Sequence, residues 1–259
     1  MTDIHRAAQQ GFSQEAATYA RGRPEYPDTI LPWLKRELDI DAGDTVVDLG
    51  AGTGKFTKLL LQTDASIIAV EPVAAMRVQF EETFPTVKIL VGNAQAIPLP
   101  DNSANAVVCA QAFHWFATVE ALREIHRTLR PDGKLGLIWN VRDEATDWVA
   151  ALDEIMHPYE GDAPRFISGE WRRPFSSHYF SPLQQTTFSH RHVGAPQAVI
   201  IDRSLSISFI AALPAAEKSK VKTQLQTLIA THPALRDKDE IVFPYYTAAY
   251  WCSRLNDPQ

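Results

Sequence analysis

The stretch VVDLGAGTGKF, residues 46–56, joins an apolar run to a helix-like run through closely spaced glycines. The chain has 12 glycines, and three of them, Gly50, Gly52 and Gly54, fall within this short turn. Because glycine has no Cβ, such a turn lets a ligand approach the backbone closely. The stretch therefore predicts a ligand site where a strand gives way to a helix.

Two common nucleotide-binding loops differ from this stretch. A P-loop has the pattern G-x-x-x-x-G-K-[ST], but Leu49 stands at its first glycine and Phe56 at its Ser/Thr position. The dinucleotide fingerprint G-x-G-x-x-G/A would have Lys55 as its third small residue, which disfavours NAD without excluding it. The third possibility is a ligand without pyrophosphate, whose carboxylate or ribose uses the helix N-terminus.

An acidic residue ends the next apolar run. The run SIIAVE (66–71) finishes with Glu71, 21 residues after Gly50. A carboxylate at the end of that strand accepts hydrogen bonds from ribose hydroxyls. NAD and S-adenosylmethionine both carry such a ribose, so Glu71 indicates a ribose without selecting between them.

Strand and helix patterns alternate along the first half of the chain. The predicted strands are short and apolar on both faces, which is typical of a parallel sheet covered by helices on both sides. The alternation predicts a doubly wound, Rossmann-like α/β sheet. The predicted strands are TVVDL (45–49), SIIAVE (66–71), VKILVG (87–92), AVVCAQ (106–111) and, after a turn at 131–133, KLGLIWN (134–140).

The pattern changes after Asn140. Residues 185–193 and 241–254 are strand-like, and two helical runs, about 197–212 and 214–231, lie between them. We expect these strands to add an antiparallel end to a mostly parallel sheet, with a helical cap between them. The expected division of this one domain is an N-terminal lid segment (1–27), a cofactor-binding core (28–145) and a C-terminal part with the substrate cap (146–259).

Composition excludes several classes of partner. The net charge is -6 and the pI about 5.7. Proteins that bind DNA or RNA usually carry a basic face, so a nucleic-acid partner is not expected. The sequence has no apolar run of the ~18 residues that span a bilayer and no signal-peptide core near its start. We expect a cytoplasmic protein with no membrane partner and with reduced cysteines. The oligomeric state is not predicted.

Four segments resemble the class I S-adenosylmethionine-dependent methyltransferases in order and spacing. They are VVDLGAGTGKF, IIAVEPVAAM, VGNAQAIPLPDNSANAVVCAQAFHWF and REIHRTLRPDGKLGLIWN. The resemblance covers about residues 45–140 and is greatest to the small-molecule branch with the ubiquinone/menaquinone-biosynthesis and trans-aconitate types. It implies S-adenosyl-L-methionine as cofactor and in-line methyl transfer to a small-molecule acceptor. An NAD-dependent oxidoreductase and a non-catalytic S-adenosylmethionine-binding module remain as alternatives.

The resemblance also implies roles for the matched positions. Asp48 would brace the glycine turn, and Glu71 would hold the ribose. Asn93 stands where the family usually has aspartate, and its amide oxygen keeps an acceptor for the adenine amino group. The remaining implied cofactor contacts are Gly50, Ala51, Gly52 and Gly54 in the turn, Pro72 and Met76 beside the adenine, Ala94 at its edge, and Gln111 and Ala112 near the reacting methyl group.

Two further groups of residues are candidates for the site. His114 and Trp115 follow the fourth predicted strand, where a doubly wound sheet forms its crevice. His114 is interpreted either as a general base or as a hydrogen-bonded wall residue, and Trp115 as a residue that lines the substrate or faces the sulfonium. In the N-terminal lid, Tyr19 and Arg23 are expected to contact the cofactor, with Arg23 pairing to its carboxylate. No metal site is expected.

Overall fold

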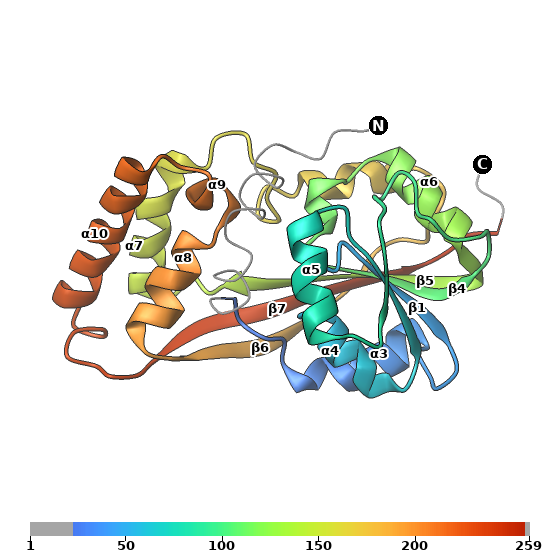
Figure 1. Ribbon diagram of the computed structural model, residues 1–259, viewed down its shortest axis with the longest axis horizontal. Helices are drawn as coiled ribbons and strands as arrows, with labels where there is room; N and C mark the ends of the chain where they lie inside the picture. The colour runs from blue at the N-terminus through green and yellow to red at the C-terminus, as the bar shows by residue number, and fades with distance from the viewer. Residues whose placement is uncertain (1–22, 257–259) are drawn as a thin grey trace.

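The computed structural model describes residues 23–256, so Tyr19 lies outside the described residues. Within this range the chain forms a seven-stranded sheet of order β3-β2-β1-β4-β5-β7-β6 (Figure 1). Strands β1 to β5 run parallel, whereas β7 is antiparallel to both β5 and β6. This confirms the predicted α/β class. The strands are β1 (Thr45–Leu49), β2 (Ser66–Val70), β3 (Lys88–Leu90), β4 (Ala104–Ala110), β5 (Leu129–Arg142), β6 (Gln184–Gly194) and β7 (Ile241–Ser253).

Helices cover both faces of the parallel part of the sheet. One apolar core joins α6 to the sheet through Leu122 and Ile125, and a second joins α3 and α4 to the other face through Leu34 and Leu59. Burial on both faces explains why the strands are apolar throughout. The helices here are α3 (Leu31–Leu38), which follows a 3-10 turn at Asp28–Ile30, α4 (Thr57–Leu60), which continues as a 3-10 turn at Leu61–Thr63, α5 (Ala74–Thr83) and α6 (Val119–Thr128).

A third apolar cluster lies under the C-terminal helices, at one end of the long strands β6 and β7 (Figure 1). It joins Leu152 of α7 and Val221 of α10 to Phe243 of β7. The expected helical cap is therefore present and has an apolar core of its own. Its helices are α7 (Asp147–Met156), a π-helix (Gln197–Asp202), α8 (Arg203–Leu205), α9 (Ser208–Ala211) and α10 (Ala215–Thr231), and 3-10 turns lie at Phe113–Trp115, His157–Tyr159 and Glu170–Ser176.

The bounds predicted for β5 were wrong. Instead of a turn at 131–133 followed by a new strand, β5 begins at Leu129 and contains an irregularity. Ala104 of β4 pairs with Leu129, but Ala106 pairs with Lys134, so the intervening residues bulge out of the ladder. Asp132 lies in the bulge with a φ of 64°, a left-handed conformation that Asp tolerates. The turn-forming residues therefore make a bulge without ending the strand.

The loop after β3 is held in place by one arginine of α6. Arg127 pairs with Glu124 at 2.7 Å and with Asp101 at 2.6 Å. It also donates to the carbonyl oxygens of Leu99 and Ile97. These bonds fix the loop that follows Asn93 and Ala94, two of the expected adenine contacts. None of the helices in the described range has the length and apolar character needed to cross a membrane.

Candidate functional site

The strand order reverses between β1 and β4, and a cavity opens at the carboxyl ends of these strands. Doubly wound sheets bind their ligands at such a switch point. The glycine turn forms one wall: Gly50 and Gly52 have φ of 74° and 57°, which favours glycine. A Cβ on Gly50 would lie 2.7 Å from that of Ala112, whereas one on Gly52 would meet nothing within 4 Å. Gly50 thus allows two loops to pack, and Gly52 leaves open space beside the cavity.

Glu71 ties the glycine turn to the end of β2. Its Oε2 accepts a hydrogen bond from the Gly52 N–H at 2.9 Å, and its Oε1 accepts one from the Val73 N–H at 2.8 Å. Burial raises the pKa of Glu71, and these two N–H groups oppose that shift. Because each carboxylate oxygen has two lone pairs, both keep an acceptor site for a further donor such as a ribose hydroxyl.

Asp48 lies under the same turn and is almost fully buried. Its Oδ2 accepts a hydrogen bond from the Thr57 hydroxyl at 2.6 Å, which links β1 to α4. Within the described part of the chain its Oδ1 has no hydrogen-bond partner, and the residue lines the cavity. Burial, together with the negative charge of Glu71, raises the pKa of Asp48 to about 7, against the opposing effect of Thr57. The Oδ1 atom is suited to accept a hydrogen bond from a ligand ammonium group.

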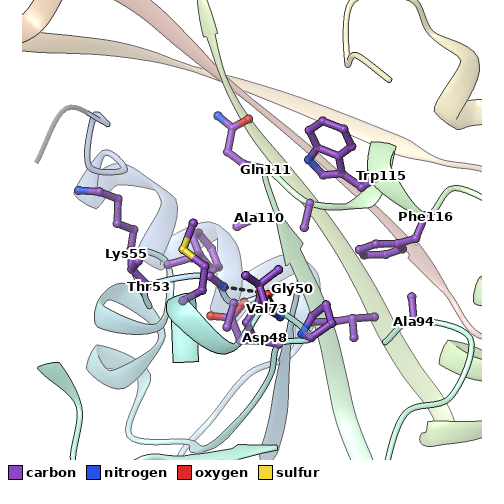
Figure 2. Close-up of a pocket in the computed structure, with 18 of the residues that line it drawn as sticks. Asp48, Gly50, Thr53, Lys55, Val73, Ala94, Ala110, Gln111, Trp115 and Phe116 are labelled. Atoms are coloured by element: carbon purple, nitrogen blue, oxygen red, sulfur yellow. Dashed lines mark hydrogen bonds between the residues drawn. The ribbon is translucent and has the colours of Figure 1, made fainter. Parts of the chain in front are cut away.

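The cavity brings together nearly all the cofactor residues expected from the sequence. Figure 2 shows Gly50 and Val73 at one end of it and Gln111 and Trp115 at the other. The expected residues that line it are Arg23, Asp48, Gly50, Ala51, Gly52, Glu71, Pro72, Met76, Asn93, Ala94, Gln111, Ala112 and Trp115.

Gly54 does not line this cavity, contrary to expectation. A Cβ there would lie 2.4 Å from the ring of Phe84 and 2.9 Å from that of Phe80. The third glycine is therefore explained by close packing of the turn against α5.

The sequence reading missed other residues in the walls. Lys55 lines the cavity and pairs with Glu25 at 2.9 Å. Asn140 of β5 and Arg203 of α8 line it as well. Asn140 could have been predicted, because it is a polar residue at the end of an apolar strand. Nothing in the local sequence marks Arg203, because the cap fold alone brings it to the site.

His114 lines a second, adjoining cavity. Its Nδ1 lies 3.0 Å from the indole nitrogen of Trp139. An indole N–H only donates, so Nδ1 is the acceptor and the proton of the neutral ring is on Nε2. Burial, followed by the charges of Arg23 and Arg165, lowers the pKa of His114 to about 3, so the ring is neutral near pH 7. His114 thus presents an N–H donor.

The two cavities share a boundary at the ends of β4 and β5. Arg23, Gln111, Trp115, Asn140 and Arg203 line both of them. Gln111 has a φ of 56°, and its side chain donates to the Asn140 carbonyl at 2.9 Å. A left-handed non-glycine residue is strained, and such strain clusters at functional sites. In turn, the Asn140 amide donates to the carbonyl of Glu25 at 2.9 Å, which anchors the segment after Arg23.

Comparison with known proteins defines the family. Residues 47–137 match the methyltransferase domain family. An uncharacterised methyltransferase-like protein of Schizosaccharomyces pombe is 40% identical over 240 residues, which cover 92% of this chain and 93% of that protein. An uncharacterised methyltransferase of Mycobacterium tuberculosis strain H37Rv is 37% identical over 247 residues, covering 95% of this chain and 97% of the relative.

A solved structure shares the fold over most of the chain. It is a putative type II methyltransferase from Anaeromyxobacter dehalogenans, with a TM-score of 0.63 and 20% identity, covering 92% of this chain and 99% of that one. The chain therefore belongs to the methyltransferase family, and its sheet and glycine turn are those of the class I S-adenosylmethionine-dependent branch.

The raised pKa of Asp48 predicts a pH-dependent stability. Its pKa is about 7 in the folded protein against an ordinary value of 3.8, so the folded state binds more protons than the unfolded state between these values. Stability from this group is therefore lost as the pH rises through that window. Relative to Asp48→Asn, the free energy of unfolding of the natural protein should fall by about 2 kcal/mol between about pH 5 and pH 8, measured by urea unfolding. A constant difference over this range would contradict the assignment.

Proposed function

We propose that this protein binds S-adenosylmethionine in the first cavity and transfers its methyl group to a small-molecule acceptor in the second. The observation that carries the proposal is the shared boundary of the two cavities at Gln111, Trp115 and Asn140. A methyl donor and its acceptor need adjoining sites that meet at the reacting group. Membership of the methyltransferase family supports this function over the NAD-dependent alternative.

The walls of the first cavity fit the chemical groups of this cofactor. The Glu71 oxygens suit the ribose hydroxyls, and the Oδ1 of Asp48, which has no partner among the described residues, suits the ammonium group. Pro72, Val73 and Met76 offer an apolar surface for the adenine. The open space above Gly52 allows the backbone to approach the ligand without an intervening Cβ.

The residues at the boundary would position the reacting groups. When bound, the cofactor supplies a methyl group on a positively charged sulfur, which an acceptor nucleophile displaces in line with S-adenosylhomocysteine as the leaving group. The ring of Trp115 lines both cavities and can face that positive charge. Gln111 is held against β5 by its bond to Asn140. Because the donor is activated, the protein contributes mainly position and exclusion of water.

The outer parts of the chain are proposed to close this site. Ile207 and Phe209 of the helical cap line the second cavity, which supports a substrate-binding role for the cap. Arg23 and Tyr26 line the first cavity, which supports a lid at the N-terminal end of the described range. The division into lid, core and cap remains a proposal.

Cofactor titration tests the proposed function. Calorimetry should show S-adenosylmethionine and S-adenosylhomocysteine binding with Kd on the order of micromolar, and no binding of NAD. Gly52→Ala should weaken binding at least about tenfold, because its methyl group would enter the space beside the ligand. Gly43→Ala is the matched control, since Gly43 also has a positive φ, 89°, and open space but lies outside the cavity. Binding of NAD alone, or equal binding by the Gly52 and natural proteins, would contradict the proposal.

The role of His114 as a general base remains a prediction, and its bond with Trp139 favours the wall interpretation. We expect His114→Gln, which retains an N–H donor, to keep turnover of a methyl acceptor within about tenfold with an unchanged pH profile. Removal of a true general base costs about 100-fold or more. His178→Gln is the control, since His178 is exposed. A large loss of turnover, with loss of one limb of the pH profile, would establish His114 as the base.

A further inference from the structure

The second cavity is rich in arginine. Arg23, Arg142, Arg165 and Arg203 all line it, and among its lining residues in the described chain the acidic one is Glu144. These arginines come from distant parts of the sequence: the N-terminal segment, the end of β5, the loop after α7 and the start of α8. The fold therefore concentrates positive charge at a site in a chain whose net charge is -6.

Two of these arginines have acidic partners behind the cavity. Arg142 forms an ion pair with Asp153, and Arg165 forms one with Glu160. Glu144, Asp153 and Glu160 are thus the described acids that line the cavity or pair with its arginines, against four arginines. Within the described part of the chain the cavity therefore keeps an excess of positive charge.

Arg203 differs from its neighbours. It is only 6% exposed, and its Nε and Nη1 atoms have no hydrogen-bond partner within the described part of the chain. No ion pair to Arg203 is present among the described residues either. A buried guanidinium without a partner is unfavourable unless a ligand completes its hydrogen bonds. Arg203 lies at the boundary and lines both cavities, so a ligand in either cavity could supply the missing hydrogen-bond acceptors.

We propose that the methyl acceptor is an organic anion and that Arg203, with Arg142 and Arg165, recognises its carboxylate or phosphate group in the second cavity. This inference rests on the proposed function. The planar guanidinium presents paired donors that match both of these anions. Phe166, Ile167 and Phe209 line the same cavity and offer an apolar surface for the rest of the molecule.

The competing ligand for Arg203 is the carboxylate of the cofactor itself. The distribution of charge favours the acceptor. Arg142 and Arg165 line the second cavity and not the first, whereas the acids Asp48 and Glu71 line the first. The Nε2–H of His114 adds a donor on the side of the second cavity.

Thermal unfolding of the S-adenosylhomocysteine complex tests the inference. The added probes are benzoate, glutarate, phenyl phosphate and inorganic phosphate, with benzamide, glutaramide and phenol as neutral counterparts, all at constant ionic strength. We expect at least one anion to raise the Tm by about 2 °C or more, as a ligand that binds the folded state does. Its neutral counterpart should not raise it. Comparing the rise in Tm with the carboxylates and with the phosphates shows which of the two anionic groups the cavity binds.

Variants assign the effect to Arg203. The Arg203→Gln variant, with folding checked by circular dichroism, should lose the anion-dependent rise in Tm. Arg191→Gln should keep it, because Arg191 is exposed on β6 outside the cavity. Stabilisation by no anion, equal stabilisation by the neutral compounds, or a rise that persists in Arg203→Gln would overturn the inference.

A cofactor titration separates the competing ligand. If Arg203 bound the cofactor carboxylate, Arg203→Gln would weaken S-adenosylhomocysteine but not 5′-methylthioadenosine, which lacks that carboxylate; this result would also overturn the inference. If the variant binds each compound with the same affinity as the natural protein, Arg203 does not bind the cofactor carboxylate, and the result supports the acceptor site. If the proposed function were wrong, the natural protein would not bind S-adenosylhomocysteine. The effect of the anions on Tm would then be measured on the protein without cofactor.

Discussion

The site depends on one carboxylate that joins two strand ends. Glu71, at the end of β2, accepts hydrogen bonds from the N–H groups of Gly52 and Val73 and so holds the glycine turn after β1 in its left-handed conformation. This turn redirects the chain from β1 into α4. Under the turn, the Thr57 hydroxyl donates a hydrogen bond to Asp48. The groups proposed to bind the ribose and the methionine part therefore also shape the backbone around them, and a change at either affects the other.

Much of the sheet could be predicted from the sequence, because short apolar strands alternate with helical runs and the glycine turn marks the switch point. The errors have local causes. The PDG segment has the composition of a turn, but β5 pairs with β4 on both sides of it, at Leu129 and from Lys134, and so carries the strand through it as a bulge. Gly54 belongs to the same glycine cluster as its neighbours, yet the rings of Phe80 on α5 and of Phe84 just after it account for this glycine. In both cases a tertiary contact decided what the local pattern left open.

Residues of the second cavity were harder to find. Trp115 and His114 follow a strand and could be predicted, whereas Arg142, Arg165 and Arg203 have ordinary surroundings in the sequence. They meet only because β5 extends beyond the parallel part of the sheet and because the cap helices, some before β6 in the chain and some after it, pack at the end of the long strands (Figure 1). The contrast agrees with the proposed division of roles. The proposed donor site follows local sequence motifs, whereas the proposed acceptor site follows the packing of distant segments.

In the proposed mode of binding, the methyl donor spans the first cavity with its sulfur at the boundary beside Trp115. A crystal structure of the protein with S-adenosylhomocysteine would test this arrangement. We expect the ribose hydroxyls within hydrogen-bond distance of the Glu71 oxygens, the amino group near Oδ1 of Asp48, and the sulfur facing the second cavity. A ligand bound elsewhere, or one whose sulfur points away from the second cavity, would contradict it.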